Sequence, residues 1–176
     1  MLFRSEMAVT DEMLDIARVV RPSDCCFVPE RRQEITTEGG LDVMSQVQRI
    51  KEATAVLMGQ GIRVALFIDP DPPQIEAAAQ TGAPVVELHT GAYADSAGSR
   101  QATELERLHA GAKLAASFGL TVHAGHGLNY HNVQPVAAMR EIVELNIGHA
   151  IIARAVFDGL GVAVREMKAL MVAARE

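Results

Sequence analysis

The sequence predicts an α/β fold in which the short strands of a parallel sheet alternate with helices. Short apolar runs and amphipathic segments follow one another along the whole chain, and this alternation is typical of βα units. Glycines stand where the expected helices end, and no linker, low-complexity tract or repeat divides the chain. With 49% hydrophobic residues, the 176 residues can bury a sizeable core, so we expect a single domain.

Six apolar runs predict six strands, and an amphipathic segment follows each of them. The strands are expected at residues 2–8, 24–29, 62–68, 84–89, 120–124 and 142–146. The helices are expected at 11–20, 43–58, 73–80, 100–118, 133–139 and 148–157, with a last helix at 160–175. The chain is therefore read as six βα units followed by a C-terminal helix.

Two of these helices show the apolar stripe of a helix that packs on a sheet. In 43–58, apolar residues at helical spacing lie opposite polar residues such as Arg49 and Lys51, and the segment 160–175 has the same pattern. Glycines mark the ends of several expected helices, because a left-handed residue often terminates a helix. They are Gly59, Gly61, Gly82 and Gly119.

The pattern leaves two architectures open. An open doubly wound sheet accommodates six units and needs no missing part, so the pattern alone favours it. A TIM barrel closes with eight units in about 250 residues. The start of the chain favours the barrel, because Met1 runs directly into a strand and Glu6 already stands at the carboxyl end of that strand.

Composition argues against several partners and locations. The net charge of −6 and the pI of about 5.5 leave no evident basic face for nucleic acid or an anionic membrane. Residues 1–6 lack the apolar core of a signal peptide, and no apolar run is long enough to span a bilayer. Cys25 and Cys26 are adjacent, so a strand would point them to opposite faces. We interpret them as small buried residues in a reducing cytoplasm.

Two glycine-histidine turns near the C-terminus predict a phosphate site. Ala-Gly-His-Gly at 124–127 and Asn-Ile-Gly-His at 146–149 each follow an apolar run and precede a helical segment. Glycine lets the backbone approach a ligand, and the free N–H groups of a first helical turn favour an anion. The second turn is the better cradle because Gly148 and His149 directly open a helix, and the last two strand-to-helix loops of a barrel usually hold phosphate. We therefore expect small phosphorylated substrates.

Ionisable residues gather at the expected carboxyl ends of the strands, where parallel sheets hold their active sites. Glu87 and His89 stand two residues apart on one strand, so both point into the interior; a buried ion pair is the alternative. Glu6 could act as a carboxylate of the site, lie on the surface, or pair with Arg4. His126, between two glycines, could pass a proton, bind phosphate, or simply cap a carbonyl. Glu30, Asp69 and His149 complete this set.

Two other chemistries have less support. All three lysines fall on expected helices, so no strand-end amine is expected to form a Schiff base with a substrate. Glu87, His89 and His126 could in principle hold a metal ion, but no HExxH or CxxC spacing supports this, and we expect neither a metal nor a cofactor. The polar loop 29–40 could close over a ligand or lie solvated on the surface.

Five long and specific stretches, spread over the whole chain, match the motifs of one enzyme family in the same order. They are EMAVT at 6–10, VPERRQEITTEGGLD at 28–42, ELHTGAYA at 87–94, AGHGLNYHN at 124–132 and ELNIGHAII at 144–152. By these stretches the chain resembles the pyridoxine 5′-phosphate synthase family. Enzymes of this family close the ring in the bacterial deoxyxylulose-phosphate-dependent route to vitamin B6.

The resemblance implies a TIM barrel and a catalytic constellation. It explains the count of six, because the family's first two βα units have no counterpart here, and residues 1–176 then form the C-terminal three quarters of the barrel. By motif, Glu6 resembles the family's general base and His126 its proton donor. Glu87 resembles the carboxylate that stabilises the transition state.

The resemblance also implies the substrates. The reaction, a ring-forming transferase reaction, condenses 3-amino-2-oxopropyl phosphate with 1-deoxy-D-xylulose 5-phosphate to pyridoxine 5′-phosphate, phosphate and water. Thr36 matches a contact to the deoxyxylulose phosphate, and Gly127, Gly148 and His149 match contacts to the other substrate. The amine comes from a substrate, which agrees with the placement of the lysines on helices. The family uses no cofactor and forms homo-oligomers.

Two functions follow from this resemblance. The chain is either an enzyme of the family, or a catalytically incomplete remnant that binds phosphate or associates with full-length subunits. The family's first two units supply a further catalytic histidine and several substrate contacts. We therefore expect these 176 residues alone to bind phosphate weakly and to form no measurable product.

Overall fold

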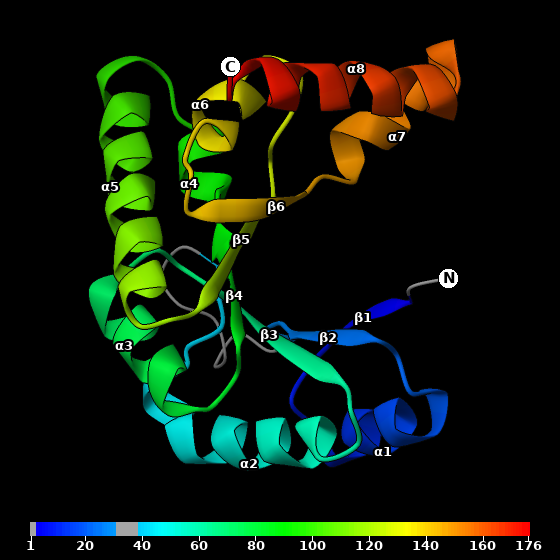
Figure 1. The fold of residues 1–176 in the computed structure, drawn as a ribbon, viewed down its shortest axis with the longest axis vertical. Helices are drawn as coiled ribbons and strands as arrows, with labels where there is room; N and C mark the ends of the chain where they lie inside the picture. Colours follow the sequence, from blue (N-terminus) through cyan, green and yellow to red (C-terminus); the bar gives the residue numbers. More distant parts are fainter. Residues whose placement is uncertain (1–2, 31–38) are drawn as a thin grey trace.

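In the computed structural model, which describes residues 3–30 and 39–176, six parallel strands form a curved sheet with helices on its outer side (Figure 1). Each strand pairs with its successor in the chain, in the order β1-β2-β3-β4-β5-β6. The strands are β1 (Arg4–Met7), β2 (Asp24–Phe27), β3 (Arg63–Ile68), β4 (Val85–His89), β5 (Thr121–Gly125) and β6 (Ile142–Asn146).

This strand order decides between the two architectures. A doubly wound sheet reverses its strand order about a switch point and needs helices on both faces. Here every connection advances by one strand in the same direction, and the inner face carries polar residues such as Glu6 and Glu87 around a cavity. The preference of the sequence pattern for an open doubly wound sheet is therefore wrong. The fold is an incomplete TIM-like barrel, as the resemblance implied.

The helices follow the strands as predicted, with shifts of one or two residues at several ends. The expected helix 43–58 opens as a short 3-10 turn, and α4 is a single helical turn that the sequence analysis did not predict, because four residues are too few to show helical periodicity. The helices are α1 (Asp11–Val20), η2 (Met44–Gln46), α2 (Val47–Met58), α3 (Pro72–Gln80), α4 (Gly91–Ala94), α5 (Gly98–Ser117), α6 (Val133–Ala137), α7 (His149–Asp158) and α8 (Leu160–Ala173).

Local chemistry sets the ends of helix α1. The Thr10 side chain accepts a hydrogen bond from the backbone N–H of Met13, and acidic residues occupy the first turn, where the helix dipole favours them. The helix ends at Arg21, which adopts a left-handed conformation with φ of 51°. Residues at its own two ends thus determine where α1 begins and ends, before strand β2 begins.

The core lies between the sheet and the helices. On β3, the alternate residues Val64, Leu66 and Ile68 are fully buried and face the helix layer, while Phe67 faces the interior of the curved sheet. Ile50 and Leu57 of α2, on the predicted apolar stripe, join the same core. Both cysteines are buried and free, as predicted; Cys25 packs in this core and Cys26 lines the inner cavity.

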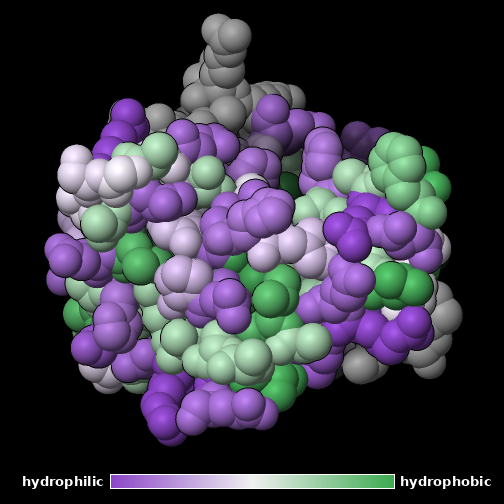
Figure 2. All heavy atoms as spheres, turned by 90° about the horizontal axis from the view of Figure 1, so that it is seen from above, coloured by the Kyte–Doolittle hydropathy of each residue, from purple (hydrophilic) through white to green (hydrophobic). Residues whose placement is uncertain are grey.

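The sheet remains open between its first and last strands. Within the described ranges, β1 and β6 each pair on one side only, and the Arg4 side chain of β1 reaches Glu144 and Asn146 on β6. Apolar side chains are exposed on α7 and α8, among them Val156 and Phe157. The face that includes α8 shows separate hydrophobic patches among hydrophilic side chains (Figure 2). Of the helices described, none has the length and apolar character needed to cross a membrane.

Candidate active site

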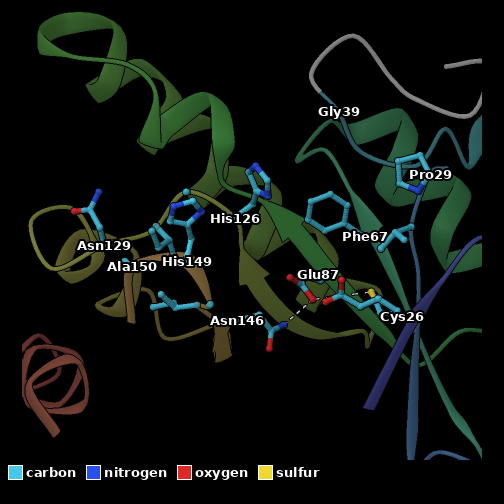
Figure 3. A pocket seen from close by; sticks show the side chains of 16 residues that line it. Cys26, Pro29, Gly39, Phe67, Glu87, His126, Asn129, Asn146, His149 and Ala150 are labelled. Carbon is cyan, nitrogen blue, oxygen red and sulfur yellow. Dashed lines mark hydrogen bonds between the residues drawn. The ribbon is translucent and has the colours of Figure 1, made fainter. Parts of the chain in front are cut away.

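A cavity of about 880 Å³ lies at the carboxyl ends of the strands (Figure 3). The strand register brings its walls together, since Glu6 is the partner of Cys26 and Phe67 is the partner of Glu87. Side chains from β1 to β4, from β6, and from the turns after β5 and β6 face this space. The residues that line the cavity include Glu6, Cys26, Phe67, Glu87, His126, Gly127, Asn146, Gly148 and His149.

Glu87 is a buried carboxyl group with an amide partner. Only 7% of the residue is exposed, and Asn146 Nδ2 donates a hydrogen bond to Glu87 Oε2 at 2.6 Å. Burial, and to a smaller extent the nearby Glu6, raise the pKa of Glu87 from 4.5 to about 7 against the opposing effect of the hydrogen bond from Asn146. At neutral pH the group can therefore exist in either protonation state. The partner of Glu87 is thus a neutral amide, whereas His89 Nδ1 lies 3.1 Å from Asp69 Oδ1.

Gly125 makes room for this pair. A Cβ at this position would collide with Glu87 Oε1 and would lie 2.9 Å from the Asn146 carbonyl oxygen. The first glycine of the predicted turn thus lets the side chains of Glu87 and Asn146 meet across β5, the strand between their own. Its partner glycine in the turn, Gly127, has φ of 74°, and a Cβ there would lie 2.6 Å from Ala94 Cβ.

His126 presents an exposed imidazole to the cavity from an unusual backbone conformation. Its φ is 82°, in the left-handed region that non-glycine residues rarely adopt. The Thr90 hydroxyl lies 2.7 Å from the carbonyl oxygen of Gly125 and 2.5 Å from that of His126, and so holds the turn. The imidazole ring lies beside the ring of Phe67, with 6.4 Å between the ring centroids (Figure 3).

Glu6 lies on the first strand and lines the same cavity as Glu87 and His126. It is exposed, and the neighbouring Arg4 binds Glu144 and Asn146. Arg4, Asn146 and Glu87 therefore form a chain of hydrogen bonds from β1 through β6 to β4. The sequence analysis considered Arg4 only as a partner of Glu6, and Asn146 only as part of the turn at 146–149. The alternation of β6, which places Glu144 and Asn146 on one face, was the available signal for their place in the site.

The turn after β6 leads directly into helix α7. Gly148 precedes the helix and His149 is its first residue, and both are exposed and line the cavity. The first N–H groups of a helix have no acceptor within the helix, so this end can bind an anion. Gly127 lines the same cavity. Thr36, the contact expected for the second substrate, lies outside the described residues.

The structure also places the other candidates. Lys51, Lys113 and Lys168 lie on α2, α5 and α8, as the sequence predicted, away from the strand ends. Among the residues with described positions, no group of three or more His, Cys, Asp or Glu side chains is arranged to hold a metal ion. His89 is buried behind His126 and approaches Asp69.

A buried carboxyl group with a pKa near neutrality, an exposed imidazole and a helix N-terminus share one cavity at the carboxyl ends of parallel strands. These features define an α/β-barrel enzyme of the acid-base type. A family model described as "Pyridoxal phosphate biosynthesis protein PdxJ" matches residues 1–173. The chain belongs to this family.

Two relatives extend this result. The chain is 60% identical over 171 residues to a protein of Pseudoalteromonas translucida (strain TAC 125) named "Pyridoxine 5'-phosphate synthase". It is 61% identical over 171 residues to a protein of the same name from Colwellia psychrerythraea (strain 34H / ATCC BAA-681). In both cases the match covers 97% of this chain and 70% of the relative.

Solved structures of low sequence identity share the fold. A xylose isomerase domain protein from Planctomyces limnophilus matches with a TM-score of 0.60 and 13% identity, over 96% of this chain and 71% of that one. An HpcH/Hpal aldolase/citrate lyase family protein from Burkholderia cenocepacia J2315 matches with a TM-score of 0.61 and 11% identity, over 98% and 77%. These likenesses support the barrel architecture alone.

Proposed function

We propose that the chain is a pyridoxine 5′-phosphate synthase, a transferase that condenses 3-amino-2-oxopropyl phosphate with 1-deoxy-D-xylulose 5-phosphate and releases phosphate and water. Membership of the family over residues 1–173 carries this proposal, together with the name that both relatives bear. The cavity adds a physical basis, because it joins acid-base groups with an anion-binding helix end.

In this proposal two side chains transfer protons and a third stabilises charge in the transition state. Glu6, which is exposed near the carboxyl end of the first strand, takes a proton from the substrate as general base. His126 delivers a proton to a leaving oxygen from the turn after β5. Glu87, whose pKa of about 7 lets it keep a proton at neutral pH, donates a hydrogen bond to a developing oxyanion or accepts one from a developing cation.

The two glycine turns hold substrate phosphate in this proposal. Gly127 and Gly148 let the backbone approach closely, and the N–H groups at the start of α7, beginning with His149, donate to the phosphate oxygens. The imidazole of His149 adds a side-chain contact. Thr36, by its match to the family motif, contacts the deoxyxylulose phosphate in this proposal.

The further partners proposed are copies of the same chain, as a homo-oligomer in the cytoplasm. The exposed apolar side chains of α7 and α8 support self-association, and the two free, buried thiols are compatible with a reducing compartment. The net charge of −6 disfavours nucleic acid and anionic membranes as partners.

The decisive experiment supplies both phosphorylated substrates to the purified chain and measures pyridoxine 5′-phosphate. The assay is run with and without a separate peptide that contains the family's first two βα units. We expect product when the peptide is present, because it restores the barrel and the histidine that those units carry. No product under either condition would contradict the proposal.

A further inference from the structure

A row of three side chains crosses the carboxyl ends of β3, β4 and β5. Asp69 directly follows β3, His89 ends β4, and His126 follows β5. His89 Nδ1 lies 3.1 Å from Asp69 Oδ1. The rings of His89 and His126 are 5.0 Å apart between centroids and inclined by 62°, an edge-to-face contact.

The first two members of this row are buried and take no part in the proposed proton transfers. Asp69 is 1% exposed and His89 is 8% exposed. Buried polar groups need partners, and here the two groups partner each other between the core and the cavity. Phe67 closes the other side of His89, with 4.9 Å between the ring centroids in another edge-to-face contact.

His126 needs support from its surroundings. It lies in a left-handed conformation between two glycines, and its side chain is exposed. Thr90 holds the backbone of the turn through its carbonyl oxygens, but this contact does not orient the imidazole. Two aromatic rings lie near the imidazole: His89, in edge-to-face contact, and Phe67, with 6.4 Å between the ring centroids.

We propose that Asp69 and His89 are positioning residues for His126. The Asp69 carboxylate accepts the Nδ1–H of His89, which fixes the tautomer and the ring plane of His89. The fixed ring then holds the imidazole of His126 in the direction of the cavity. This inference rests on the proposed role of His126 as proton donor, and it assigns a role to a buried pair outside the proposed proton transfers.

Gly91 packs closely against the ring of His89. It opens helix α4 beside the row, and a Cβ there would lie 2.6 Å from His89 Nε2 and 3.4 Å from His126 Cδ2. The substitution Gly91→Ala therefore displaces the ring of His89 without removing any titratable group. It provides a second, independent way to disturb the row.

Nuclear magnetic resonance of the ¹⁵N-histidine-labelled chain tests this inference and does not require the chain to be enzymatically active. Long-range ¹H–¹⁵N spectra distinguish the two imidazole tautomers, and the variants His89→Phe and His126→Asn assign the signals. We expect His89 in the Nδ1–H tautomer. Asp69→Asn and Gly91→Ala should both shift the ring signals of His126.

The matched control is Thr81→Val, which removes a buried hydroxyl that bonds the Ala78 carbonyl at the end of α3, away from the row. It should leave the ring signals of both histidines unchanged. Unchanged His126 signals in both Asp69→Asn and Gly91→Ala would overturn the inference, even if the enzyme assay succeeds.

Kinetics provide the second readout in the two-substrate assay. Asp69→Asn should lower kcat about tenfold or more with little change in KM, because a misdirected proton donor slows the chemical step while substrate still binds. In the His126→Asn background the same change should have little further effect, since the pair acts through His126. Full additivity of the two losses would refute the positioning role, whereas absence of product in every protein would count against the proposed function and leave the spectroscopic result standing.

Discussion

The raised pKa of Glu87 makes the stability of the fold depend on pH in a direction unusual for a carboxylic acid. Burial disfavours the charged form, so the folded pKa is about 7 against an ordinary value of 4.5. A tenfold change in an equilibrium constant corresponds to about 1.4 kcal/mol, so the rise is worth about 3 kcal/mol of lost stability once the group is fully ionised. We expect Glu87→Gln to recover most of this amount above neutral pH.

The sign follows from proton uptake. Between pH 4.5 and about 7 the unfolded chain has released the proton of Glu87 while the folded chain keeps it. Folding then binds a proton, and the free energy of unfolding falls as pH rises through this window. Below pH 4.5 both states are protonated and the penalty is absent. In Glu87→Gln the amide has nearly the same shape and cannot ionise, so this part of the pH dependence should disappear.

Urea unfolding followed by circular dichroism measures the effect. We compare the free energy of unfolding of Glu87→Gln with that of the unaltered chain at several pH values from 4.5 to about 8. The difference isolates the effect of Glu87 from that of other titrating groups, such as His123, because burial lowers the pKa of His123 in both proteins. Glu144→Gln is the matched control. The Arg4 side chain lowers the pKa of Glu144 below its ordinary value of 4.5. The Glu144→Gln variant should therefore be less stable than the unaltered chain above pH 4.5, and this deficit should fade as the pH falls below 4.5. A difference for Glu87→Gln that stays constant across the window would refute the reasoning.

The other predictions concern binding and turnover. Gly148→Val should abolish the binding of inorganic phosphate, measured by calorimetry, because the valine side chain enters the cavity. A Cβ at this position meets no described protein atom within 4 Å. Gly161→Val on α8 is the control, and unchanged phosphate affinity in Gly148→Val would place the site elsewhere. In the assay that includes the peptide with the family's first two βα units, Glu6→Gln and His126→Asn should each reduce kcat by roughly 10²-fold with nearly intact substrate binding, whereas Glu106→Gln on the outside of α5 should not; near-normal turnover would remove the tested residue from the mechanism. A peptide with the family's first two βα units should bind at the unpaired edges of β1 and β6 and protect their amides from hydrogen exchange; unchanged protection would show that these edges do not accept strands.

Several parts of the site were accessible from the sequence. Glycines before and after His126, and the run from Asn146 to His149 at the start of a helical segment, are local patterns with a direct physical meaning. The face shared by Glu87 and His89 follows from the two-residue period of a strand, and both side chains are indeed buried at the strand end. The motif resemblance added the barrel and the family, and the family match over residues 1–173 confirms it.

Other features depend on residues that are distant in the chain. The pKa of Glu87 is set by burial and by Asn146, which follows 59 residues later and meets Glu87 only through the register of β4, β5 and β6. Arg4 could have paired with Glu6 on its own strand, but it reaches Glu144 across the interior of the curved sheet. The alternation of β6 places Glu144 and Asn146 on one face, but no local pattern identifies Arg4 and Glu87 as their partners.

The sequence by itself determined the elements of this protein: six strands, the helices between them, the turns at their carboxyl ends and the motifs of its family. Those features depend on local periodicity and on the conformational limits of single residues such as glycine. The local pattern left the strand order open; the motif resemblance implied consecutive strands and the tertiary structure shows them. Only the tertiary structure decided that Asp69, His89 and His126 form a row. The physical reason is that strand order and register are settled by long-range packing of apolar faces, which many local patterns can satisfy and which only the folded chain selects.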